Sequence, residues 1–220
     1  MGARATKTWL AAAAGGAMLA LAATPSQAQG PWYASVTGNA VWVSDSDWNS
    51  SGGPNGTFEY DTGWGIDGAL GYSLSGSMQG VRVEGEVGYR SNDIDKVNVN
   101  NFGLVPGGTG DIDVWTGLIN GYYDIDLGSN IMPYVGAGLG IAHVDGQVIV
   151  PGPGGRISDS ETVFAYQFSA GLGYAVSPST TLFAGYRYLA TDDIDFSGGG
   201  TTVSSEYHSH NAQAGVRFSF

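Results

Sequence analysis

The feature that most restricts the fold of this chain is a two-residue alternation that runs through unusually long segments. In residues 80–91, GVRVEGEVGYRS, alternate positions from Val81 read Val, Val, Gly, Val and Tyr, whereas those from Arg82 read Arg, Glu, Glu, Gly and Arg. A β-strand places these two sets on opposite faces. One face is therefore apolar and the other charged, and the surroundings of each face decide what kind of sheet this is.

Eight segments of this kind are predicted to be strands. They lie at residues 31–45, 58–74, 80–93, 111–126, 131–145, 161–176, 181–192 and 206–220. Most have twelve residues or more, whereas strands of globular sheets usually have about five or six. Such lengths suit tilted strands that cross a bilayer, which need roughly 9–11 residues within the apolar zone.

The connections between these segments alternate in length. The long ones are residues 46–57, 94–110, 146–160 and 193–205, and the short ones are residues 75–79, 127–130 and 177–180. Long loops at one end and short turns at the other are typical of outer-membrane barrels with an even number of strands. The fold expected is all-β: an eight-stranded antiparallel up-and-down transmembrane β-barrel.

A secreted eight-stranded barrel of the lipocalin type is the soluble alternative. It would need an apolar interior and a polar exterior, and the alternation alone fits either arrangement. The asymmetry of the loops favours the membrane barrel. So do the Gly-Tyr pairs that recur in five of the eight segments, because tyrosine favours the membrane boundary.

The N-terminus is typical of a cleavable secretory signal. Arg4 and Lys7 precede an apolar run, and Ser26-Gln27-Ala28 supplies small residues for cleavage after Ala28. The domains expected are a signal peptide at residues 1–28 and the barrel at residues 29–220. The mature part has 6 basic and 20 acidic residues, so its formal charge is −14, which argues against nucleic acid as a partner. No cysteine is present, and no cofactor is expected.

The charged face of the predicted strands indicates a polar network inside the barrel. An eight-stranded lumen is just wide enough to be filled by side chains, and a buried charge is costly unless it is paired. Arginines are therefore expected to pair with carboxylates across the lumen. The residues assigned to this network are Arg82, Glu84, Glu86, Arg187, Arg217 and Asp67.

Several motifs resemble those of the small outer-membrane β-barrel proteins of Gram-negative bacteria. These are Gly215–Phe220, which alternates and ends in phenylalanine, Leu182–Leu189 (LFAGYRYL), Pro133–Gly140 (PYVGAGLG) and Asn120–Asp124 (NGYYD). The group includes the OmpA barrel, OmpX, the opacity proteins and "porin family" surface antigens. The resemblance implies an outer-membrane location. It also implies that Phe218 and Phe220 form the signal that the barrel-assembly machinery reads.

Three classes of function follow from the resemblance. The first is a structural or surface-interaction protein, in which the barrel is an anchor and four long loops meet lipopolysaccharide or an extracellular partner. The second is a narrow pore for small solutes, which the charged lumen disfavours. The third is a lipid A-modifying enzyme, and here the chain departs from the pattern.

The enzyme class would rest on residues 207–212, YHSHNA, which faintly resemble the His-x-Ser-Asn-Ala motif of a lipid A deacylase barrel. The nucleophile position two residues after His208 is occupied by His210, and no acidic residue follows Glu206. Acyl transfer needs an activated nucleophile, so we expect no enzyme activity. A metal site from His208 and His210 also has little support, since His143 is the only other histidine.

The last motif is Asp-Ile-Asp, which occurs four times, at residues 93–95, 111–113, 124–126 and 193–195. Three copies fall at the long-loop ends of segments. Asp93, Asp95, Asp111, Asp113, Asp193 and Asp195 are expected to form an acidic rim there. The simpler interpretation is a solvated rim. The alternative is weak binding of Mg²⁺ or Ca²⁺, which prefer oxygen ligands, shared with lipopolysaccharide phosphates.

Overall fold

The computed structural model describes residues 30–44, 46–50, 56–99, 103–104, 109–150, 155–198, 201–205 and 207–220. The predicted signal peptide lies outside these residues. The strands within them are β1 (Trp32–Val43), β2 (Ser46–Ser50), β3 (Gly56–Tyr60), β4 (Gly63–Ser73), β5 (Val81–Val99), β6 (Gly103–Leu104), β7 (Thr109–Asp124), β8 (Ile131–Val150), β9 (Gly155–Ser177), β10 (Thr180–Thr191), β11 (Ile194–Gly198), β12 (Thr201–Ser205) and β13 (His208–Ser219). A short 3₁₀ helix covers Gly76–Met78. Among the described residues, no helix has the length and apolarity needed to cross a bilayer.

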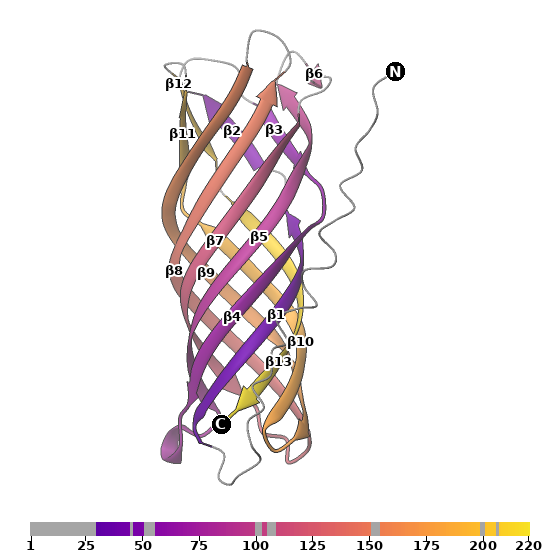
Figure 1. Cartoon of the computed structure of the whole chain (residues 1–220), viewed down its shortest axis with the longest axis vertical. Helices are drawn as coiled ribbons and strands as arrows, with labels where there is room; N and C mark the ends of the chain where they lie inside the picture. The colour runs from indigo at the N-terminus through magenta and orange to yellow at the C-terminus, as the bar shows by residue number, and fades with distance from the viewer. Residues whose placement is uncertain are drawn as a thin grey trace.

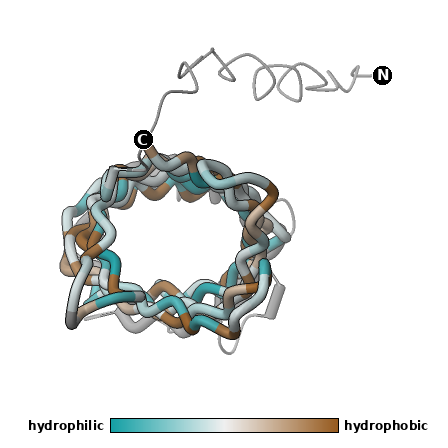
Figure 2. The backbone as a smooth tube through the Cα atoms, turned by 90° about the horizontal axis from the view of Figure 1, so that it is seen from below, coloured by the Kyte–Doolittle hydropathy of each residue, from teal (hydrophilic) through white to brown (hydrophobic). Residues whose placement is uncertain are grey.

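Eight long strands form the wall of a closed antiparallel barrel (Figure 1). Their order around the ring is β1, β4, β5, β7, β8, β9, β10 and β13. The ring closes because β13 pairs with β1, with Tyr33 opposite Ser219 and Val43 opposite Ser209. Figure 2 shows this closed ring of backbone from below. The predicted fold is confirmed.

The wall extends further than the sequence predicts. The four connections predicted as long loops contain strand structure: β2 with β3, the last residues of β5 with β6, the ends of β8 and β9, and β11 with β12. The pairing of β8 with β9 continues to Val150 opposite Gly155. The loop prediction was therefore wrong over much of residues 46–57, 94–110, 146–160 and 193–205. These connections are rich in Gly, Pro, Asn and Asp, which disfavour strands, but a ladder whose register is already set can continue past such residues.

The opposite end of the barrel carries the short turns and both chain ends described, Gly30 and Phe220 (Figure 1). The turns use Gly76, Gly80 and Gly128, whose φ angles of 73°, 90° and 66° suit glycine. In the second turn, the Gly128 backbone N–H donates to Asp126 Oδ1 at 2.8 Å. We call this end the turn end, and the other end the crown end.

The alternation in the sequence becomes an inside and an outside. In β1, Tyr33, Ser35, Thr37 and Asn39 are buried, whereas their neighbours are exposed or half-buried. The exposed set of the wall is rich in Val, Leu, Ile, Trp and Tyr. A barrel with its apolar residues outside and its charged residues inside suits an exterior that meets lipid.

Candidate functional site: the lumen and the outer surface

The centre of the lumen holds an ion-pair network around Arg187. Its Nη1 donates to Asp67 Oδ2 at 2.8 Å, and its Nη2 donates to Glu86 Oε2 at 2.9 Å. Arg90 Nη2 lies 3.2 Å from Asp67 Oδ1, outside hydrogen-bond geometry, so that contact is electrostatic. All four side chains are almost fully buried. Glu86 and Asp67 thus hold two arginines between them.

A second group lies toward the turn end and centres on Arg82. Its guanidinium donates to both carboxylate oxygens of Asp124, at 2.7 and 3.0 Å, and to the Tyr33 hydroxyl at 3.0 Å. The Tyr33 hydroxyl donates in turn to Glu84 Oε2 at 3.0 Å. Arg217 Nη1 lies 3.6 Å from Asp124, nearer the mouth. Paired in this way, neither Arg82 nor Glu84 is a solitary buried charge.

Amide side chains join the two groups. Gln167 donates to Glu86 Oε1 at 3.3 Å and to Asn120 Oδ1 at 2.8 Å, and Asn120 donates to Glu84 Oε1 at 3.3 Å. Asn39 donates to Asp67 Oδ2 at 2.7 Å. The resulting network spans the barrel from β1 to β9 and ties strands that are distant in sequence.

The structure brings together all six residues assigned to the lumen, and two further ones. Arg90 shares their inward parity, and its place could have been read from the sequence. Asp124 is the last residue of β7, at the turn end, and its carboxylate reaches Arg82 and Arg217. The available signal was parity, because Asp124 lies two residues after the buried Tyr122. The described lumen thus holds four arginines and four carboxylates, so its formal charge is zero.

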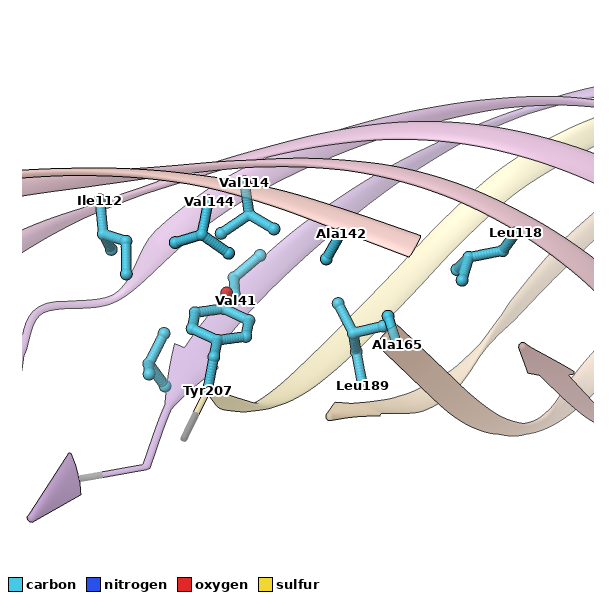
Figure 3. Packing of buried hydrophobic residues seen from close by; sticks show 10 residues of the cluster. Val41, Ile112, Val114, Leu118, Ala142, Val144, Ala165, Leu189 and Tyr207 are labelled. Atoms are coloured by element: carbon cyan, nitrogen blue, oxygen red, sulfur yellow. The ribbon is translucent and has the colours of Figure 1, made fainter. Parts of the chain in front are cut away.

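An apolar layer fills the lumen between this network and the crown end, which the sequence interpretation missed. Figure 3 shows its residues, which come from β1, β7, β8, β9 and β10 and from the residue just before β13. They are Val41, Val43, Ile112, Val114, Leu118, Ala142, Val144, Ala165, Leu189 and Tyr207. On the inward face of β1, the polar Asn39 is followed two residues later by the apolar Val41. The same face of this strand therefore contributes to both layers. Charged and apolar layers therefore follow one another along the described part of the lumen.

One small cavity lies within the described lumen. Its volume is about 30 Å³, and it lies toward the turn end, lined by Arg82, Glu84, Asp124, Arg187 and Arg217 among others. This volume suits water rather than a solute.

The outer surface carries two belts of aromatic residues and histidines. On β4, β7 and β9 the belt residues are eight positions apart: Trp64 and Tyr72, Trp115 and Tyr123, Tyr166 and Tyr174. On β1, Trp32 and Trp42 are ten apart, and on β13 His210 and Phe218 are eight apart. At roughly 3.3 Å per residue and a tilt near 40°, these spacings correspond to about 20–25 Å, close to the apolar band of an outer-membrane barrel.

The predicted acidic rim is partly visible on the outer face beyond the crown-side belt. Asp93 on β5 lies directly opposite Asp111 on β7, and Asp113 lies opposite Asp145 on β8. Asp113 also accepts a hydrogen bond from the Tyr89 hydroxyl at 2.9 Å. Asp193 is exposed, and the side chains of Asp95 and Asp195 lie outside the described part. Among the described side chains, no group of three or more acidic, histidine or cysteine residues is arranged to hold a metal ion.

The motif that resembled a catalytic site is split by the strand. Ser209 and Asn211 are fully buried in the lumen, whereas His208 and His210 lie on the outer face. Their imidazoles contact Tyr188 and Tyr186 rather than the serine. A serine and a histidine on opposite faces cannot act as a nucleophile and its base.

The terminal strand ends with its aromatic residues outward. Phe218 and Phe220 are 44% and 55% exposed, at the turn-side belt. Phe220 N–H donates to the Trp32 carbonyl at 2.9 Å, so the end of the chain closes onto β1. The predicted assembly signal is therefore presented on the outer face.

These features define an integral outer-membrane β-barrel protein. A family model described as "Outer membrane protein beta-barrel domain" matches residues 10–220, so the chain belongs to that family. It is 34% identical to outer membrane protein PagN of Salmonella typhimurium over 86 residues, 37% of this chain and 36% of PagN. It is 29% identical to opacity protein opA65 of Neisseria gonorrhoeae over 123 residues, 44% of this chain and 49% of that protein. The matches thus span about a third to a half of these relatives.

Two solved structures share the fold. Neisserial surface protein A has 21% identity and a TM-score of 0.52, with 88% of this chain and 100% of that one covered. OprG of Pseudomonas aeruginosa has 16% identity and a TM-score of 0.52, with 86% and 97% covered. Membership of this family places the protein in the outer membrane.

Proposed function

We propose that the protein is a membrane-anchored surface-interaction protein whose crown faces the cell exterior and binds a basic partner. The crown is defined by sequence as residues 43–63, 91–114, 144–163 and 190–207, and its described parts lie beyond the crown-side belt. It contains 15 acidic residues and two basic ones, Lys96 and Arg156. The acidic residues are Asp45, Asp47, Glu59, Asp61, Asp93, Asp95, Asp111, Asp113, Asp145, Asp159, Glu161, Asp192, Asp193, Asp195 and Glu206.

The distribution of charge is the observation that supports this proposal. The lumen network is neutral, so almost the whole of the mature charge of −14 belongs to the crown, at −13. Such a surface attracts cations and repels nucleic acid and sulfated polysaccharides. The ion pairs and the apolar layer in the described lumen disfavour transport, and the barrel then serves as the anchor that holds the crown at the surface.

Binding to intact cells tests the proposal. Cells that display the protein are incubated with biotinylated polylysine, as a model basic polypeptide, and with biotinylated heparin. A matched variant carries Asp93→Asn, Asp111→Asn, Asp113→Asn and Asp145→Asn. We expect polylysine to bind the wild type, less to bind the variant, and added salt to weaken both. Heparin binding, or equal polylysine binding by both forms, would count against a basic partner.

Two further parts of the proposal concern biogenesis. Residues 1–28 are the export signal, and Phe218 with Phe220 is the element that the barrel-assembly machinery reads. The outward position of both phenylalanines at the turn-side belt supports the second assignment. Replacing both by alanine should leave unfolded protein in the periplasm, whereas the same change at the exposed Ile125 and Leu127 should not.

A further inference from the structure

The small cavity toward the turn end of the lumen has an excess of positive charge in its lining. Three guanidinium groups and two carboxylates line it, so the charged side chains around it sum to +1. The two carboxylates that pair with Arg187, those of Asp67 and Glu86, lie outside the lining. The charged residues of the lining are Arg82, Arg187, Arg217, Glu84 and Asp124.

Both carboxylates of the lining already accept a hydrogen bond on each oxygen. Asp124 accepts from the Arg82 guanidinium at 2.7 and 3.0 Å. Glu84 accepts from Asn120 Nδ2 at 3.3 Å on Oε1 and from the Tyr33 hydroxyl at 3.0 Å on Oε2. Neither carboxylate therefore depends on a donor within the cavity.

Arg217 is the cation of the lining whose donors are least used. Its side chain is only 12% exposed. Among the described residues, its guanidinium approaches Asp124 at 3.6 Å, beyond hydrogen-bond distance, and lies over the Tyr33 ring, 5.5 Å from the ring centroid. Arg82 lies over the same ring at 5.4 Å. Two guanidinium groups thus share one carboxylate and one ring, and a mostly buried cation of this kind needs a further acceptor.

Neutral hydrogen-bonding side chains lie beside Arg217. Ser35 is directly opposite it in the pairing of β1 with β13, Thr37 is the next inward residue of β1, and both line the cavity. Gln213 is 5% exposed and also lines the cavity, and its Oε1 has no hydrogen-bond partner. A half-turn of this amide lets the oxygen accept from the Tyr134 hydroxyl, which Nε2 now contacts at 2.9 Å, and turns the NH₂ group to the cavity.

We propose that this cavity binds one small monovalent anion, chloride or another halide, from the water at the turn end. A halide accepts from the Arg217 guanidinium and from the Ser35 and Thr37 hydroxyls at once, and its charge offsets the excess charge of the lining. The cavity of about 30 Å³ suits water, and a halide ion is only slightly larger, whereas sulfate, phosphate and sugars are too large. The inference is independent of the partner proposed for the crown, which is acidic and repels anions.

Chlorine NMR on the purified barrel tests the inference, because exchange of chloride onto a protein broadens its signal. The barrel is refolded in uncharged micelles, and the chloride line width is compared with that of empty micelles at constant ionic strength. We expect excess broadening from the wild type, which bromide removes by competition and sulfate does not. No excess over empty micelles would mean that the cavity holds water only, and would overturn the inference.

Matched variants locate the ion. Arg217→Met removes the charged donor, and Ser35→Ala with Thr37→Val removes both hydroxyls at nearly constant volume, so each should weaken chloride binding roughly tenfold. Ser169→Ala is the control, since this luminal serine is 6% exposed and lies outside the lining. Heat-modifiable gel mobility confirms that each variant is folded. Equal broadening by the wild type and the Ser35 and Thr37 double variant, an equal loss in Ser169→Ala, or displacement by sulfate would also overturn the inference.

Discussion

Arg187 and Asp67 are 120 residues apart in sequence, yet Arg187 Nη1 lies 2.8 Å from Asp67 Oδ2 in the middle of the lumen. The contact joins β10 to β4, which are not neighbours in the barrel. It is completed by Glu86 on β5, whose Oε2 accepts from the same guanidinium at 2.9 Å. One arginine thus connects two opposed parts of the wall.

Removal of this arginine should be the most damaging single change in the lumen. Arg187→Ala leaves Asp67 and Glu86 as buried carboxylates, and we expect the free energy of unfolding to fall by about 3–5 kcal/mol. Arg217→Ala is the control, because Arg217 lies near the mouth and its loss should cost much less. Urea titration of both variants in micelles measures the difference. Equal losses would contradict a central role for Arg187.

A double-mutant cycle can isolate the pair itself. Arg187→Met combined with Glu86→Gln should be less destabilising than the sum of the two single changes, because neither charge is then left unpaired. Additive effects would show that the contact contributes nothing of its own.

The two luminal layers should block conductance independently. Leu118→Ala with Leu189→Ala opens the apolar layer and should cost about 2–5 kcal/mol per residue, but the ion-pair network should keep the barrel closed in planar bilayers. Glu86→Gln alone should also stay closed, because the apolar layer remains. Conductance is expected only when both layers are altered. A wild-type barrel with steady conductance would instead indicate a pore.

The absence of cysteine from the sequence allows a clean test of orientation. Asp193→Cys at the crown end should react with a membrane-impermeant maleimide on intact cells, and Ser129→Cys at the turn end should react only after lysis. This follows if long connections face outward and short turns face the periplasm. Labelling of Ser129→Cys on intact cells would reverse the orientation proposed here.

The carboxylates that face each other at the crown should weaken the barrel. Like charges directly opposite in an antiparallel pair are destabilising, so Asp111→Asn should raise the free energy of unfolding by roughly 0.2–1 kcal/mol at neutral pH and low salt. If the rim also binds divalent ions, millimolar Ca²⁺ should raise the melting temperature of wild type more than that of Asp93→Asn with Asp111→Asn. An equal rise in both proteins would indicate that the acidic rim is solvated and binds no divalent ion.

The predicted signal peptide can be checked directly. The mature protein isolated from outer membranes should begin at Gln29 if cleavage follows Ala28. Intact-protein mass spectrometry gives the N-terminus without digestion. A protein that retains Arg4 and Lys7 would contradict the prediction.

The sequence alone was enough to predict the closed barrel, its strand order and which face meets lipid. The two-residue alternation assigns each strand residue to the lumen or to the lipid face. Eight long segments, joined alternately by short turns and long connections, leave few possible arrangements of the strands in a sheet. The alternation alone therefore assigned Arg82, Glu84, Glu86 and Arg187 to the lumen. Parity cannot give depth along the barrel, however, or which carboxylate an arginine reaches.

The depth of a residue along the barrel and the partner of each arginine depend on the stagger between strands, which only the tertiary structure decides. The stagger brings Asp124 to Arg82 and Arg90 to Asp67, although these residues are 42 and 23 positions apart. It also stacks Val41, Val114, Val144 and Leu189 into an apolar layer that no single strand reveals. The same registration places Trp42, His210 and Tyr188 in one row on the outer face. The alternation within one strand determines whether a side chain points inward or outward, whereas contacts between distant strands form only when the barrel closes.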